Sequence, residues 1–322
     1  MLTKLIRNGW MGLIWLILLI SCQPTPPGPL SPSLSEADGT GATRVVEHAM
    51  GTTVVPASPE RVVVLDYAPL DTALALDIQP VGRMAVTSAP LYEDAISAIP
   101  TVGNWPQPSL EAILQLDPDL ILSNRVTSEA IYSQLAQIAP TVLSQDNGRK
   151  GDWQANFQLY AEALGQTERA EQLLADYRQR VEGLQASLTE TPETLIVSVI
   201  AHWSGGIVAY SANSFSGSVL QEIGFARNPA QGEGKRYGIE LSREDLTEID
   251  GDVVFLLHTH TLEDSMAKSA FINDPLWSTL HAVEQGLVCE VDSIVWTGGR
   301  SILAANQILT DVELCLKAIG RR

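Results

Sequence analysis

A short pattern occurs twice in the chain at a constant offset, and it constrains the fold more than any other feature of the sequence. The residues Ser109, Glu111, Ile113, Leu116, Asp117 and Asp119 match Ser242, Glu244, Leu246, Ile249, Asp250 and Asp252, each pair lying 242 − 109 = 133 positions apart. In both copies a Ser can cap a helix whose first turn carries Glu, and the helix leads into an apolar strand. The repeat therefore predicts two related α/β lobes.

Short apolar runs alternate with amphipathic stretches along the chain, as sheets built from βα units require. The predicted strands are residues 61–65, 119–122, 195–200, 252–257 and 287–291. Two clear amphipathic helices are predicted over residues 128–138 and 301–317. The sequence therefore predicts an α/β fold with mainly parallel sheets.

The middle of the chain, residues 152–188, carries spaced apolar residues and almost no strand signal. Gly165 and Thr167 indicate that one helix ends and another begins, and Thr191 with Pro192 ends the second. A helix from residue 167 to about 188 would be roughly 30 Å long at about 1.5 Å per residue, enough to link two lobes. We predict an N-terminal lobe over residues 44–166, a linking helix over 167–190 and a C-terminal lobe over 191–322.

The first residues have the pattern of a secretory signal. Lys4 and Arg7 precede an apolar run over residues 9–20, which is short for a membrane-spanning helix. The run ends in Leu-Ile-Ser-Cys22, which resembles the bacterial lipobox, where the Cys is lipidated and the preceding segment removed. We predict a signal peptide over residues 1–21, a lipid anchor on Cys22 and a disordered Pro- and Ser-rich tether over 22–43. An uncleaved anchor helix is the alternative, and both place the folded part outside the cytoplasm.

The net charge excludes one class of partner, and the cysteine count allows one disulfide. The formal charge of −18, from 38 acidic and 20 basic residues, argues against nucleic acid, whose phosphates are bound by Lys and Arg. With Cys22 assigned to lipid, Cys289 and Cys315 remain. An oxidising compartment allows a disulfide between them, and two buried thiols are equally compatible with the sequence.

Several segments resemble the siderophore and cobalamin periplasmic binding proteins, in the order and spacing of that family from about residue 44 to the C-terminus. The segments are RVVVLDY at 61–67, LAL at 74–76, PVG at 80–82, VG at 102–103, PSLE at 108–111, DPDLI at 117–121, SFSG at 214–217 and DPLW at 274–277. The resemblance implies two lobes bridged by one rigid helix, with a ligand cleft between them. It also implies a monomer without a cofactor that binds a ferric siderophore and delivers it to the permease and ATPase of an ABC importer.

In that family, Glu residues at the positions of Glu111 and Glu244 dock the two lobes onto Arg pockets of the permease. Two carboxylates, one per lobe, can orient the protein over a two-fold transporter. A Glu that merely favours a helix N-terminus is the alternative for each of them.

The ligand of an open α/β sheet binds beyond the carboxyl ends of the strands. Arg offers a planar fork to anionic oxygens, and Trp and Tyr cover apolar faces, so such residues after the strands are candidates. The predicted ligand-binding residues are Tyr67, Arg83, Trp105, Arg125, Trp203, Arg236, Tyr237 and Trp296. Trp105 stands where many siderophore binders have an Arg, which leaves the charge of the ligand open. For any single Arg the alternative is a surface ion pair, and for any single aromatic residue it is a place in the core.

The sequence gives less support to other ligands and functions. Cobalamin, haem or a directly bound transition metal is the alternative ligand. His258 and His260 alternate as metal ligands on a strand do, but the remaining His residues are scattered, so we expect no metal site.

WSGG at 203–206 and SFSG at 214–217 lack the G-x-S-x-G arrangement, and no catalytic set can be named, so we expect no enzyme. An adhesion or assembly protein would need neither the matched Glu residues nor the Arg and Trp residues after strands.

Overall fold

The computed structural model describes residues 41–320 except 86–89, 189–190, 204–205, 233, 235, 259–261 and 319. The predicted signal peptide, Cys22 and most of the predicted tether lie outside the described residues, as does His260. Among the described residues, no helix is both long and apolar enough to cross a membrane.

The N-terminal lobe is built on a six-stranded sheet with the order β6-β5-β4-β3-β7-β8. Its strands are β3 (Val62–Val64), β4 (Gly82–Ala85), β5 (Thr101–Asn104), β6 (Gln107–Pro108), β7 (Leu120–Asn124) and β8 (Thr141–Ser144). All neighbours are parallel apart from β5 and β6. A hairpin of β1 (Thr43–His48) and β2 (Gly51–Pro56) precedes this sheet. The strands predicted at 61–65 and 119–122 are confirmed.

The helices of this lobe connect the strands. They are α1 (Tyr67–Ala75), α2 (Glu93–Ile96), α3 (Leu110–Gln115), α4 (Arg125–Ser128) and α5 (Tyr132–Ile138), with a 3-10 turn, η1 (Glu129–Ile131), between the last two. The helix predicted over 128–138 is therefore interrupted, because η1 breaks the α-helical hydrogen bonding in its first half.

The C-terminal lobe has a second six-stranded sheet, with the order β12-β10-β9-β13-β14 and β11 paired to β9. Its strands are β9 (Ile196–Trp203), β10 (Gly206–Tyr210), β11 (Ala226–Arg227), β12 (Gly238–Leu241), β13 (Val253–His258) and β14 (Val288–Asp292). Strand β9 is parallel to β11 and β13, and β13 is parallel to β14, whereas β10 is antiparallel to β9 and β12. The strands predicted at 195–200, 252–257 and 287–291 are confirmed, and the two-lobed α/β fold with mainly parallel pairing is present.

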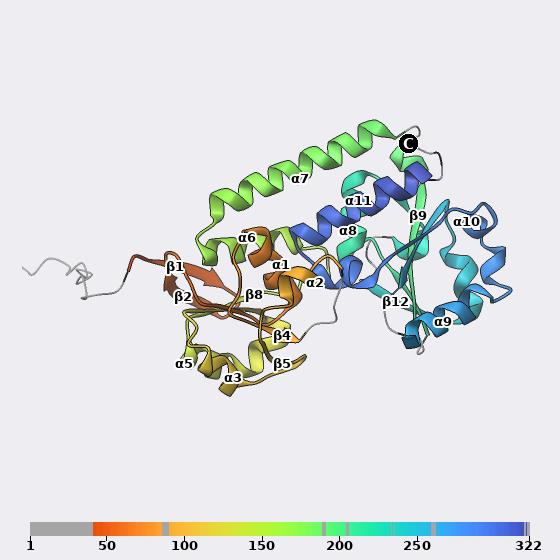
Figure 1. The fold of residues 1–322 in the computed structure, drawn as a ribbon. Helices are drawn as coiled ribbons and strands as arrows, with labels where there is room; N and C mark the ends of the chain where they lie inside the picture. The colour runs from red at the N-terminus through yellow and green to blue at the C-terminus, as the bar shows by residue number, and fades with distance from the viewer. Residues whose placement is uncertain are drawn as a thin grey trace, which may run out of the picture. The chain divides into compact units, whose positions relative to one another are not determined.

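Two helices fill the middle of the chain, as predicted. The first, α6 (Trp153–Leu164), ends at Gly165 in the left-handed conformation, and α7 (Thr167–Ser187) is the long helix (Figure 1). Helix α7 packs against α6, α8 (Phe215–Ile223) and the C-terminal helix α11 (Ile302–Ala318), so it contacts elements of both lobes. The remaining helices, α9 (Leu262–Ile272) and α10 (His281–Glu284), follow strand β13.

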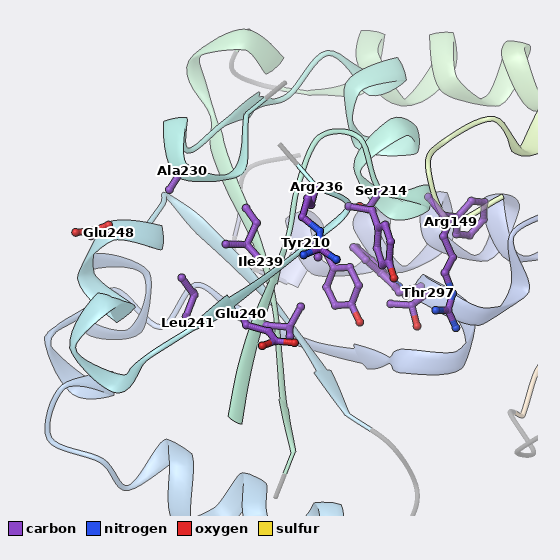
Figure 2. A pocket seen from close by; sticks show the side chains of 15 residues that line it. Arg149, Tyr210, Ser214, Ala230, Arg236, Ile239, Glu240, Leu241, Glu248 and Thr297 are labelled. Carbon is purple, nitrogen blue, oxygen red and sulfur yellow. The ribbon is translucent and has the colours of Figure 1, made fainter. Parts of the chain in front are cut away.

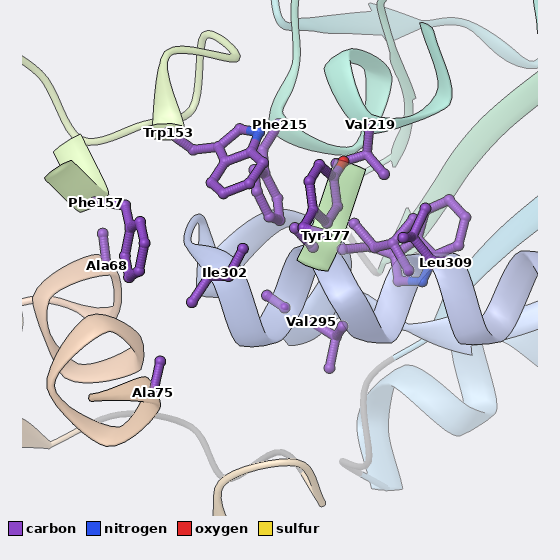
Figure 3. Packing of buried hydrophobic residues seen from close by; sticks show 14 of the residues in the cluster. Ala68, Ala75, Trp153, Phe157, Tyr177, Phe215, Val219, Val295, Ile302 and Leu309 are labelled. Atoms are coloured by element: carbon purple, nitrogen blue, oxygen red, sulfur yellow. The ribbon is translucent and has the colours of Figure 1, made fainter. Parts of the chain in front are cut away.

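The central strands β3, β7 and β13 are buried on both faces, as parallel sheets require. Val62 and Val64 face one apolar cluster while Val63 faces another, because side chains alternate along a strand. The largest cluster extends through both lobes beneath α7 and α11 (Figure 3). At its centre Trp153 stands edge-on to Tyr177 and Phe215, with ring centroids 5.2 Å and 6.1 Å away. One apolar cluster is therefore common to both lobes, and each lobe has a smaller cluster of its own.

The repeated Asp residues, Asp119 and Asp252, accept backbone hydrogen bonds at equivalent places in the two lobes. The carboxylate of Asp119 accepts hydrogen bonds from the backbone N–H groups of Glu60 and Arg61, at 2.7 Å and 2.9 Å, and Asp252 accepts one from Ile196 at 2.8 Å. Each carboxylate thus fixes the start of the first strand of its six-stranded sheet beside the strand that follows the Asp. The repeated pattern is structural in part, which the sequence alone did not indicate.

The caps of the repeat differ in detail. Ser109 caps α3 by accepting from the N–H of Ala112, whereas Ser242 forms a capping box with Asp245 at the start of a 3-10 helix, η4 (Arg243–Ile249). The second copy is therefore not the α-helix that the pattern predicted. A disulfide between Cys289 and Cys315 joins β14 to α11, which resolves the alternative that the sequence left open.

Candidate ligand pocket

A pocket of about 780 Å³ lies beside β12, the edge strand of the second sheet (Figure 2). Most of its wall comes from the C-terminal lobe, and Arg149 reaches it from the loop between β8 and α6. The lining residues are Arg149, Val208, Tyr210, Ser214, Phe215, Ala230, Arg236, Tyr237, Gly238, Ile239, Glu240, Leu241, Glu248, Trp296 and Thr297. The volume falls in the range of small-molecule sites.

Two cations of the pocket are free to bind a ligand. Arg149 and Arg236 are exposed, and neither guanidinium has a hydrogen bond or ion pair with any other residue that the structure describes. Glu240 and Glu248 also line the pocket, and Figure 2 shows Glu248 beside Ala230, on the opposite side of the view from Arg149. The end of the pocket near Arg149 is therefore more positively charged than the end near Glu248.

Aromatic and hydroxyl groups complete the end near Arg149. Burial raises the pKa of Tyr210, against smaller opposing effects of a hydrogen bond with Thr297 and of the nearby Arg149 charge. The phenol of Tyr210 therefore stays neutral. Trp296 is fully buried, its indole N–H donates to Asp311 at 2.8 Å, and its ring lies 4.7 Å from that of Phe255. Trp296 therefore forms part of the pocket wall, but its indole N–H is already hydrogen-bonded to Asp311 and is not available to a ligand.

A buried ion pair joins the lobes beside the loop of Arg149. The Nη2 of Arg300 lies 2.7 Å from Asp66, and the two side chains are only 3% and 6% exposed. The other nitrogens of Arg300 donate to the carbonyls of Gly298 and Asn147, at 2.7 Å and 2.6 Å. Asp66 also accepts from the side chain of Asn124. Because Asn147 lies in the loop of Arg149, this ion pair helps to fix that loop.

Comparison with known proteins identifies the family. A family model described as periplasmic binding protein matches residues 62–295. The chain belongs to the periplasmic binding protein family. It is 37% identical over 287 residues to the probable siderophore-binding lipoprotein YfiY of Bacillus subtilis, covering 84% of this chain and 87% of that one. It is 32% identical to the achromobactin-binding periplasmic protein of Dickeya dadantii, over 79% of this chain and 85% of that one.

A solved structure of the family shows the same fold. The crystal structure of Staphylococcus aureus SirA complexed with staphyloferrin B superposes with a TM-score of 0.76 at 27% identity, covering 85% of this chain and 99% of that one. The resemblance to this family that the sequence motifs indicated is confirmed.

The structure brings together three of the predicted ligand residues, Arg236, Tyr237 and Trp296, because all three line the pocket. Tyr67 opens α1 and lies beside Gly298, next to the pocket residue Thr297. Trp203 ends β9, and its side chain is not among those described.

The other three predicted residues lie in the N-terminal lobe and are not lining residues of the pocket. Arg83 lies within β4 rather than after it, and its guanidinium donates to the carbonyls of Met84 and Ile96 at 3.1 Å and 3.3 Å. Arg125 opens α4 within 2.8 Å of the side-chain amide of Gln145. Trp105 is 59% exposed between β5 and β6. Their role in binding stays a prediction.

Sequence reasoning missed Arg149, Tyr210 and Thr297. Arg149 follows β8, a four-residue strand that the sequence analysis did not include, and Tyr210 ends β10, which was also missed. The same rule of searching after strand ends would have found both residues if those two strands had been predicted.

The two predicted permease-docking residues lie at matching positions of the two lobes. Glu111 and Glu244 are both exposed in the first turns of α3 and η4. His258 ends β13. Among the residues that the structure describes, no group of three or more His, Cys, Asp or Glu side chains could hold a metal ion.

Proposed function

We propose that this protein captures a ferric siderophore outside the cytoplasm and delivers it to an ABC importer. The proposal takes its ligand class from relatives that bind siderophores, achromobactin or Fe(3+)-citrate, together with the SirA complex with staphyloferrin B. The observation that carries it is that Arg149 and Arg236 both line one pocket and have no acidic partner among the described residues. Their guanidinium groups are therefore available to an anion that enters this pocket.

The same pair points to a negatively charged ferric complex with exposed carboxylate or similar oxygens. A guanidinium binds such oxygens through two parallel hydrogen bonds, which are stronger when both groups are charged. Tyr210 and Tyr237 can cover the apolar parts of the ligand. We propose that Tyr67, Arg83, Trp105, Arg125 and Trp203 of the original prediction contribute when the ligand is bound.

A titration of the purified protein with Fe(3+)-citrate tests the ligand class. We expect saturable quenching of its tryptophan fluorescence, because Trp296 lines the pocket. Iron-free citrate should bind more weakly, and so should a cationic ferric trihydroxamate, whose hydroxamate oxygens all coordinate iron and which has no free carboxylate for arginine to bind. Equal affinity for the cationic complex would contradict the assignment of an anionic ligand.

Delivery to the importer is proposed to use Glu111 and Glu244. Both are exposed, one in each lobe, at matching positions of the repeat. Replacing both with Ala should leave the affinity for the ferric complex unchanged, since neither lines the pocket, but should abolish uptake in cells, because the permease would lack its charge partners. Normal uptake by the double variant would show that these residues only favour the starts of their helices.

We propose that the protein is a monomer held to the membrane by lipid on Cys22. The support is the basic start, the short apolar run and the Ser21-Cys22 pair, together with relatives named as lipoproteins. Replacing Cys22 with Ala should move the protein from the membrane fraction to the soluble fraction. Retention of the variant in the membrane would favour an uncleaved anchor helix instead.

A further inference from the structure

Arg227 carries a buried guanidinium that no acidic side chain of the described residues neutralises. It ends β11, and its Nη2 donates to the backbone carbonyl of Tyr210 at 2.6 Å and to the side-chain oxygen of Gln231 at 2.8 Å. The residue as a whole is partly buried, but Nε and Nη1 are fully buried and have no hydrogen-bond partner among the described residues. Burial lowers the pKa of Arg227 to about 10, so the side chain stays charged at neutral pH.

Arg227 lies directly behind the wall of the candidate pocket. Tyr210, whose carbonyl it binds, lines the pocket, and so does Ala230, the neighbour of Gln231. Gln231 is fully buried, its oxygen also accepts from the N–H of Val199 at 3.1 Å, and its side-chain nitrogen has no partner in the described part of the chain. Three unpaired donors therefore cluster behind this wall, two on Arg227 and one on Gln231.

Such an arrangement is unfavourable for the fold by itself. A buried charge normally has an opposite charge and a full set of hydrogen bonds, because desolvation is costly. This chain has 38 acidic residues, yet none of those described is paired with Arg227. The arrangement becomes favourable when a negative charge enters the neighbouring pocket, because a charge surrounded by protein is screened less than one in water.

We propose that Arg227 is a buried positive charge behind the pocket wall that strengthens the binding of anionic ligands without contacting them. The inference rests on the proposed function, because it requires an anion in this pocket. It differs from a purely structural role, in which Arg227 would serve only to hold Tyr210 and Gln231 through hydrogen bonds.

Three substitutions separate charge from hydrogen bonding. Arg227→Met removes the charge and keeps an unbranched apolar side chain, and Arg227→Gln also removes the charge but keeps a donor for the carbonyl of Tyr210. Arg227→Lys keeps the charge and loses the planar fork. Each variant is titrated with Fe(3+)-citrate and with a cationic ferric trihydroxamate, and its unfolding in urea is followed in parallel.

We expect Arg227→Met and Arg227→Gln to bind Fe(3+)-citrate roughly tenfold more weakly than the wild type, with a smaller change for the cationic complex. Arg227→Lys should stay close to the wild type. The urea midpoint of Arg227→Met should be unchanged or higher, because an uncompensated buried charge is removed. If the Met variant fails to fold, the Gln variant must still show the tenfold loss.

Equal affinity of the wild type and both neutral variants would overturn the inference and leave the proposed function intact. A loss in Arg227→Lys with none in Arg227→Gln would also overturn it, because hydrogen bonding rather than charge would then set the affinity. A wild-type protein that binds no ferric complex would overturn both this inference and the proposed function.

Discussion

Arg300 and the two pocket arginines, Arg149 and Arg236, lie in opposite surroundings. Arg300 is 3% exposed, is paired with Asp66 and donates through all three of its nitrogens to protein oxygens. Arg149 and Arg236 are exposed and have no partner among the described residues. Arg300 lies at the contact between the lobes, whereas Arg149 and Arg236 face a pocket.

The contrast shows how the role of an arginine can be inferred from its donors. When every donor is used inside the protein, none is left for a ligand, and removal of the side chain leaves a buried carboxylate without its counter-ion. When the donors face a cavity without partners, the side chain adds little to folding and is available for an anion. Arg227 combines the two conditions: its guanidinium is buried, as that of Arg300 is, and it has no acidic partner among the described residues, which is also true of Arg149.

The largest expected effect belongs to the buried pair. Arg300→Ala should lower the free energy of unfolding by about 3–5 kcal/mol, because Asp66 would keep its buried charge without the guanidinium. Urea unfolding followed by circular dichroism measures this loss. A change below about 1 kcal/mol, as surface ion pairs give, would show that the pair of Arg300 and Asp66 contributes no more to stability than an exposed pair. The proposed difference between Arg300 and the pocket arginines would then be wrong.

The smallest expected effect belongs to the pocket arginines in the same assay. Arg149→Gln and Arg236→Gln should each change the free energy of unfolding by less than about 0.5 kcal/mol, as surface substitutions do. Arg169→Gln, an exposed change of the same charge on α7, is the matched control. Strong destabilisation by either pocket substitution would assign that arginine a structural role.

Much of the fold could be predicted from the sequence because parallel strands buried on both faces form continuous apolar runs. Residues 62–65 and 253–257 are such runs, and the structure has β3 and β13 there. The edge strand β12 contains Gly238 and an exposed Glu240, so it has no apolar run to recognise. The α-helix expected after Ser242 is a 3-10 helix, since a capping pattern fixes where a helix begins but not its type.

The site was harder to predict because position after a strand does not show what a side chain contacts. Trp296 lines the pocket as expected, but its indole N–H is bonded to Asp311, fifteen positions along the chain. Arg83 was predicted to bind the ligand from its position in the sequence, which could not show that its guanidinium donates to the carbonyl of Ile96. Arg300 was not singled out, because only the folded chain brings it to Asp66, which lies 234 positions earlier. Partners that are distant in sequence decide which arginines remain available.

The most direct test of the account is the affinity of the Arg149→Gln, Arg236→Gln double variant for Fe(3+)-citrate, measured beside the wild type and Arg169→Gln. Each lost charge-assisted contact should weaken binding by about tenfold, so the double variant should bind roughly a hundredfold more weakly. The Arg169 control should bind like the wild type. A double variant that folds normally and binds as tightly as the wild type would contradict the claim that these two free arginines hold the anionic ferric ligand.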